Sequence, residues 1–93
     1  MQIQHDVLSN GGIFFLEKQQ YKLAEITYMW KNEDIIVANH TWVDDSLRGQ
    51  GVARELLDAL VNFTRQNKLK IVPMCSYVEV MFRRDKSFVD VIA

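Results

Sequence analysis

The chain has 93 residues, of which 48% are hydrophobic and 25% charged, and its formal net charge is -1. This length predicts a single domain over residues 1–93, and the near-neutral charge argues against a nucleic-acid partner. A single cysteine excludes an intrachain disulfide framework, and Cys75, His5 and His40 lack the paired spacing of a structural zinc site, so we expect no metal. Without a signal peptide or an apolar run of ~20 residues, the sequence predicts a cytoplasmic protein with no membrane contact.

The first half of the chain has the two-residue period of β-strands. Ile13–Leu16 is a short apolar run, Tyr21–Trp30 alternates between apolar and more polar positions, and Ile35–Val43 is a third candidate strand. The polar breaks at 17–20 and 31–34 have the length of hairpin turns. The pattern therefore predicts an antiparallel meander of these three strands.

The second half changes to a helical period. From Gly51 to about Asn67, apolar residues recur in steps of three and four, which predicts an amphipathic helix. Lys70–Pro73 follows as a short strand that ends at its proline. Ser76–Arg84 is a second candidate helix with Ser76 as its cap, and the tail 88–92 could dock as a last strand or as coil. Because a helix crossover joins the third strand to Lys70–Pro73, these two strands should be parallel, which gives an α/β fold with a mixed sheet.

Two glycines lie just before the long helix. A helix N-terminus offers unpaired N–H groups and partial positive charge, and glycine lets the backbone approach an anion closely. Arg48 adds a charged donor beside Gly49 and Gly51. These features fit a phosphate-binding loop, although a plain strand-to-helix turn with a solvated Arg48 has the same composition. The segment lacks the Lys-Ser/Thr pair of a Walker A motif.

The segment Arg48–Ala53 resembles the Arg/Gln-x-x-Gly-x-Gly/Ala pattern of the acetyl-CoA loop in the GNAT superfamily of N-acetyltransferases. With His40–Val43 and Val72–Tyr77, it also resembles the small, minimal YidJ-type N-acetyltransferase domain-containing proteins. The resemblance implies a minimal GNAT fold, in which antiparallel N-terminal strands precede a β-α-β-α unit with a splayed parallel strand pair. It implies that the pyrophosphate of coenzyme A is held by Arg48, Gly49, Gln50, Gly51, Val52 and Ala53.

The resemblance further implies an enzyme that transfers an acetyl group from acetyl-CoA to an amine acceptor. The pantetheine arm would pair with the backbone of Thr41, Trp42 and Val43, which brings the thioester near His40 and Cys75. His40 is chemically suited to act as the base; the alternative is a strand histidine that points at solvent or fills a half-buried slot.

Two further residues are candidates for the chemistry. Tyr77 is the only tyrosine in its region and matches the acid that larger relatives carry on their last helix. Cys75 could accept the acetyl group, donate a proton or line the thioester pocket; a buried, small apolar cysteine is the alternative.

Three kinds of function remain open from the sequence. The first is the acetyltransferase, and the second is a coenzyme A-binding or acyl-CoA-sensing module with little catalysis. The chain is much shorter than typical members of the superfamily, so a protein partner or a homodimer could complete the acceptor site. The third is an interaction domain that uses its exposed sheet face.

Overall fold

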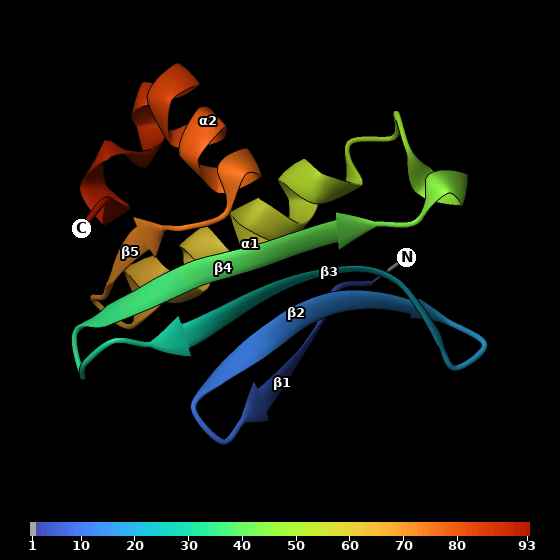
Figure 1. Cartoon of the computed structure of the whole chain (residues 1–93), viewed down its shortest axis with the longest axis horizontal. Helices are drawn as coiled ribbons and strands as arrows, with labels where there is room; N and C mark the ends of the chain where they lie inside the picture. Colours follow the sequence, from blue (N-terminus) through green and yellow to red (C-terminus); the bar gives the residue numbers. More distant parts are fainter. Residues whose placement is uncertain (1) are drawn as a thin grey trace.

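A computed structural model describes residues 2–93 (Figure 1), and these residues form a mixed α/β fold around a five-stranded sheet with the order β1-β2-β3-β4-β5. Neighbouring strands are antiparallel from β1 to β4, whereas β4 and β5 are parallel. The strands are β1 (Gln4–Leu8), β2 (Gly11–Lys18), β3 (Tyr21–Trp30), β4 (Ile35–Val43) and β5 (Lys70–Pro73). The helices are α1 (Val52–Gln66), α2 (Ser76–Arg84) and the 3-10 helices η1 (Asp45–Leu47) and η2 (Lys86–Val91).

The core lies between α1 and one face of the sheet. Helix α1 forms because its apolar side chains fall on one stripe, and this stripe contacts β2, β3 and β4. Leu56, Leu57 and Leu60 are fully buried there, opposite the buried Ala24 and Ile26 of β3. Complete burial of one leucine contributes roughly 1.5–3 kcal/mol, so this stripe fixes α1, and with it the start of the helix, against the sheet.

The helix α2 and the 3-10 helix η2 extend the same layer beyond β5. Val78 and Phe82 of α2 and Phe88 of η2 are buried in the same core cluster as α1. The tail ends with Ile92 bridging Ile71 of β5 in a parallel sense. The tail 88–92, expected as a last strand or as coil, is therefore the end of a 3-10 helix followed by this single bridge. Ser76 does not cap α2: the cap residue is Cys75, without a side-chain hydrogen bond to the helix.

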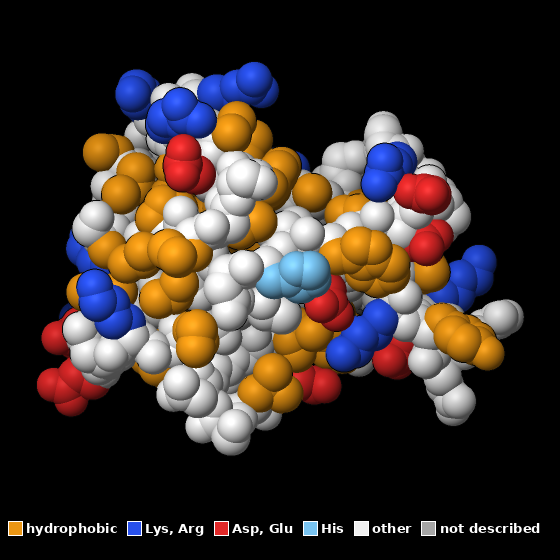
Figure 2. Space-filling view, viewed as in Figure 1, with side chains coloured by type: hydrophobic (Ala, Val, Ile, Leu, Met, Phe, Trp, Pro, Cys, Tyr) orange, Lys and Arg blue, Asp and Glu red, His pale blue; other side chains and the backbone are white. Residues whose placement is uncertain are grey.

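The face of the sheet opposite α1 is open over β3 and β4. Met29 and Trp42 are exposed there, and Figure 2 shows hydrophobic side chains on this face together with a histidine that lies beside charged side chains. On β2 the same face buries Ile13 and Phe15, and the ammonium group of Lys22 lies 5.3 Å from the centre of the Phe15 ring.

The prediction of a three-strand meander was incomplete, because β1 adds a fourth antiparallel strand and β2 begins at Gly11 instead of Ile13. All residues of β1 are exposed, so Gln4–Leu8 shows none of the alternation by which a half-buried strand is recognised. In residues 2–93 no helix has the length and apolar character needed to span a bilayer.

Candidate functional site

The strands β4 and β5 separate at the end of β5. Their pairing runs from Ile35 and Lys70 to Ala38 and Pro73, and there it stops. The N–H groups of Met74 and Cys75 then both donate to the carbonyl oxygen of Ala38, at 3.0 and 2.9 Å. Beyond this junction β4 continues to Val43 with no β5 residue beside it. From Asn39 to Val43, β4 therefore has one backbone edge without a β5 partner.

A β-bulge at Asn39 changes which side chains of β4 face the core. Ala38 pairs with Tyr28 and His40 pairs with Thr27, so Asn39 is the additional residue. As a result the side chain of Ala38 points into the core, whereas His40 points to the open face of the sheet. Without the bulge, Ala38 and His40 would point to the same face, because side chains two residues apart in a strand share a face.

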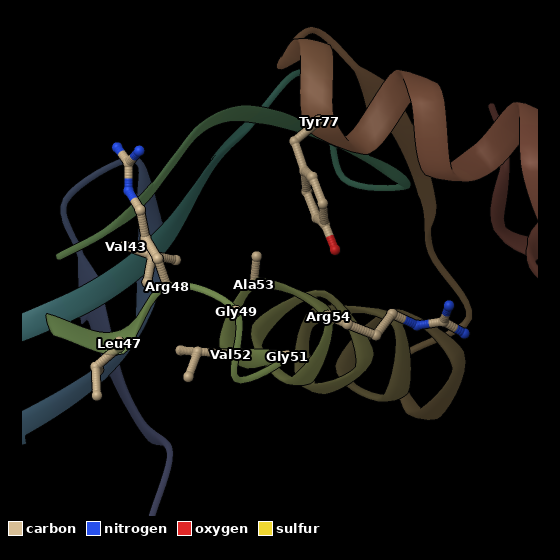
Figure 3. A pocket seen from close by; sticks show the side chains of 9 residues that line it. All are labelled: Val43, Leu47, Arg48, Gly49, Gly51, Val52, Ala53, Arg54 and Tyr77. Atoms are coloured by element: carbon tan, nitrogen blue, oxygen red, sulfur yellow. The ribbon is translucent and has the colours of Figure 1, made fainter. Parts of the chain in front are cut away.

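A cleft of about 310 Å³ lies between the end of β4, the loop that follows it and the start of α2. Figure 3 shows its side chains, with the ring of Tyr77 extending from α2 toward the first turn of α1. The lining residues are Val43, Leu47, Arg48, Gly49, Gly51, Val52, Ala53, Arg54 and Tyr77.

The two glycines of the cleft adopt left-handed backbone conformations, with φ of +79° at Gly49 and +75° at Gly51. A Cβ atom on either would have no neighbour within 4 Å, so glycine is favoured at both positions by the backbone conformation and not by close packing. Gly51 caps α1 without a side-chain bond, and the first N–H groups of a helix have no carbonyl one turn earlier. The loop thus brings two left-handed glycines and the N-terminus of α1 together at the wall of the cleft.

The two arginines of the cleft differ in how firmly they are held. Arg48 pairs with Asp45 at 2.8 Å, but the side chains are 75% and 88% exposed, so this ion pair restrains Arg48 weakly. Arg54 donates to Asp58 at 3.0 Å and to Asp85 at 2.8 Å. It also lies over the ring of Phe88, 4.8 Å from its centre. These contacts fix Arg54 on α1, whereas Arg48 is restrained only by its exposed ion pair with Asp45.

Tyr77 stands on the wall of the cleft opposite the loop. Burial raises the pKa of its phenol, so the hydroxyl keeps its proton at neutral pH and remains a donor. The chemistry available to this side chain is therefore proton donation into the cleft.

Cys75 lies at the junction where β4 and β5 part. Its thiol contacts the hydroxyl of Thr41, with 3.3 Å between Sγ and Oγ1, and its side chain is partly buried. Thr41 pairs across the sheet with the buried Ile26, so the contact lies on the α1 side of β4.

The remaining sequence-predicted residues lie elsewhere. His40 and Trp42 face the open side of the sheet, and Nε2 of His40 lies 3.2 Å from Oε2 of Glu25. Gln50 does not line the cleft, because its amide donates to the carbonyl oxygen of Ser46 at 3.2 Å. The structure thus brings the loop, Val43 and Tyr77 together in one cleft. On β4, Thr41 points to the side of α1, whereas His40 points to the opposite, open face.

Three residues of the region were not singled out from the sequence: Leu47, Arg54 and Glu25. Leu47 is buried beneath the loop; a lone leucine among polar residues is the signal that could have identified it as an anchor. The spacing of Arg54 and Asp58 is that of a helical ion pair. Glu25 occupies a strand position whose alternation places it on the open face beside His40 and Trp42. Among residues 2–93, no three His, Cys, Asp or Glu side chains cluster as a metal site would require.

The family model for the GCN5-related N-acetyl-transferases matches residues 13–91. A GCN5-like candidate N-acetyltransferase from Staphylococcus aureus is 36% identical, with 97% of this chain and 87% of that chain covered and a TM-score of 0.73. A GNAT family acetyltransferase from Elizabethkingia anophelis with acetyl-CoA bound is 11% identical, with 82% and 52% covered and a TM-score of 0.64.

An aminoglycoside acetyltransferase from a soil metagenomic sample is 15% identical, with 83% and 57% covered and a TM-score of 0.63. The chain therefore spans about half the length of these two more distant relatives. A search among curated proteins gave no match. The family model covers most of the chain and the Staphylococcus aureus protein aligns over nearly all of it, so the chain belongs to the family of GCN5-related N-acetyltransferases.

Proposed function

We propose that the chain is an acetyl-CoA-dependent N-acetyltransferase whose loop Arg48–Ala53 holds the pyrophosphate of the cosubstrate. The cleft at the N-terminus of α1 carries this proposal: two left-handed glycines, the first turn of α1 and a weakly held arginine line one open space. The family, and a structural relative with acetyl-CoA bound, support the choice of this ligand over other phosphates.

The unpaired edge of β4 fits the rest of the cosubstrate. The segment from Thr41 to Val43 presents backbone groups that no β5 residue takes up, and an extended pantetheine arm carries amides that could pair with them as another strand would. Bound there, acetyl-CoA would supply a thioester whose carbonyl carbon an amine nitrogen attacks while CoA leaves as a thiolate. The arm would end near Cys75, at the junction of the two strands.

Two side chains of the protein would then donate and accept the protons of the reaction. Tyr77 keeps its phenolic proton at neutral pH and would donate it to the departing thiolate. His40 would take the proton of the amine. Cys75 could instead accept the acetyl group before the amine does, forming a thioester on Sγ with release of CoA.

The main test is titration of acetyl-CoA by calorimetry with wild-type protein and with Ala53→Glu. Ala53 lines the cleft in the first turn of α1. A glutamate there suits the helix dipole, so the fold should persist while the added carboxylate repels the pyrophosphate. Asn62→Glu adds the same charge to an exposed position of α1 outside the cleft and serves as the control. Equal affinity in all three proteins would reject the loop assignment, and no binding to wild type would reject coenzyme A as the ligand.

A coenzyme A-binding or sensing module with little catalysis is the second candidate. The observation that favours it is the sheet face over β3 and β4, where Met29 and Trp42 are exposed and no described helix forms a wall for an acceptor. Release of free thiol from acetyl-CoA with a panel of amines distinguishes the two: a rate at the spontaneous level, with binding intact, favours the module.

Several finer assignments belong to the same proposal. The acceptor is an amine, and a protein partner or a second copy could complete its site on the open face. Membership of the small YidJ-type subfamily and a cytoplasmic location are also proposed. Light scattering with and without acetyl-CoA would test the dimer.

A further inference from the structure

Glu25 is a carboxylate at the centre of the open face whose partner is a histidine. It lies on β3, its side chain is 21% exposed, and Oε2 lies 3.2 Å from Nε2 of His40. Among residues 2–93 no arginine or lysine pairs with it, whereas other carboxylates of the chain, such as Asp58, Asp85 and Asp90, bond to arginines.

The position of His40 links this pair to the junction of β4 and β5. Two residues before it, the carbonyl oxygen of Ala38 accepts the N–H of Cys75, and one residue after it, Thr41 contacts the thiol of Cys75. The bulge at Asn39 places His40 on the face opposite Ala38, which the helices leave open. An amine that reaches the junction from solvent on this face would therefore meet His40 first.

The contact with Glu25 determines which nitrogen of His40 can act as a base. Nε2 and Oε2 lie at ion-pair distance without the geometry of a hydrogen bond. Because a carboxylate only accepts hydrogen bonds, repulsion between two lone pairs favours the tautomer of the neutral ring that carries its hydrogen on Nε2. The lone pair of the neutral ring is then on Nδ1.

We infer that Glu25 is a positioning residue of the acceptor side, which holds His40 by Nε2 so that Nδ1 accepts the proton of an incoming primary amine. This inference rests on the proposed acetyl transfer. The acceptor nitrogen forms the bond to the acyl carbon, the C–S bond breaks, Nδ1 of His40 receives the ammonium proton, and the thiolate is protonated by Tyr77 or by water. Because Glu25 and His40 lie on the open face, the acceptor binds opposite the cleft that lies on the α1 side.

Steady-state kinetics of acetyl transfer by the full chain test this role. Glu25→Gln keeps the shape of the side chain and should lower kcat at least about tenfold, with the affinity for acetyl-CoA unchanged. His40→Gln should lower kcat by about 100-fold or more. The double variant should be no slower than His40→Gln, because a residue that acts through His40 has no effect once His40 is gone. Glu33→Gln makes the same charge change in the exposed turn between β3 and β4 and should leave kcat unchanged.

A second measurement reports on the pair without any turnover. Nitrogen-15 NMR of the imidazole of His40 should show hydrogen on Nε2 in the wild type and a mixture of tautomers in Glu25→Gln. Wild-type kcat in Glu25→Gln, additive losses in the double variant, or the same tautomer in both proteins would overturn the inference. A wild type that binds acetyl-CoA but transfers nothing would instead reject the proposed enzyme, while the NMR comparison would still decide whether Glu25 orients His40.

Discussion

The carbonyl oxygen of Tyr28 occupies the space that a side chain on Gly11 would need: a Cβ atom there would lie 2.0 Å from it. Gly12, the next residue, pairs with Tyr28 across the sheet, and a Cβ on Gly12 would meet the Tyr28 ring at 2.4–2.6 Å. The phenol thus lies over a glycine of β2 and reaches His5 of β1, whose Nε2 is 2.8 Å from its hydroxyl. The two glycines allow three strands to pack around one tyrosine.

We therefore expect Gly11→Ala to lower the free energy of unfolding by about 1–3 kcal/mol or more, because backbone atoms of β3 must move to admit the methyl group. Urea denaturation followed by circular dichroism measures this loss. Ser9→Ala, in the exposed turn just before, should stay within about 0.5 kcal/mol of wild type. Equal stability of wild type, Gly11→Ala and Ser9→Ala would contradict the prediction, because it would show that β2 and β3 move apart easily at Gly11.

Leu47→Ala should destabilise the protein and loosen the loop over the cleft. Leu47 is 8% exposed and is the buried residue of η1. Truncation of a buried leucine costs about 2–5 kcal/mol, and we expect the lower end because Leu47 lies at the edge of the core. Calorimetric titration with acetyl-CoA should also show weaker binding. Leu8→Ala makes the same change at a 53% exposed position, and an equal loss in both variants would contradict the anchoring role of Leu47.

Thr64→Val should leave stability within about 1 kcal/mol of wild type. Thr64 is fully buried in α1, and its hydroxyl donates to the carbonyl oxygen of Leu60 at 2.8 Å. That carbonyl also lies one helical turn before the N–H of Thr64, so valine leaves no acceptor unpaired and preserves the branched shape. Thermal unfolding of both proteins checks this. A loss well above 2 kcal/mol would mean that the hydroxyl has a further, necessary partner.

Acid should weaken the contact between α1 and η2. Arg65 donates to both carboxylate oxygens of Asp90, at 2.9 and 3.0 Å, and this bonding holds the pKa of Asp90 below its usual value. Because the folded-state pKa is the lower one, the contribution of Asp90 to stability is present above the unfolded-state pKa of about 3.9 and is lost as pH falls through the folded-state value.

As the pH is lowered from about 5 to below about 3.9, the urea midpoint of wild type should therefore fall more steeply than that of Asp90→Asn. The reason is that wild type takes up more protons on unfolding in this range. Glu33→Gln removes a carboxylate from an exposed turn and controls for the change in net charge. Parallel curves for wild type and Asp90→Asn would contradict the prediction.

Periodic burial made much of this fold predictable from the sequence. The alternation in Tyr21–Trp30 and the stripe in Val52–Gln66 both reflect one face that must leave water, and both elements were confirmed, as was the parallel pairing of β5 with β4. Pro73 is the last β5 residue to pair with β4, as its missing N–H suggests. The family was also recognisable, because the loop pattern of Arg48–Ala53 depends on adjacent residues alone.

The features that were missed depend on contacts between distant residues. β1 is recognisable by its pairing with β2 and not by its composition. His40 points to the open face because of the bulge at Asn39. The residue types at 38–40 give no sign that Asn39 lacks a partner on β3. The pairing of Glu25 with His40 follows from that bulge, so neither its distance nor its face could be derived from the sequence.

The separation of β4 from β5 has a consequence for the behaviour of the protein in solution. Between the bulge and Val43, β4 presents an unpaired strand edge, and such an edge accepts any extended chain that can match its hydrogen bonds. A strand from another copy competes for the same groups that would receive the arm of the cosubstrate. Self-association at high protein concentration should therefore decrease when the ligand is present, so ligand binding would also protect the protein from aggregation.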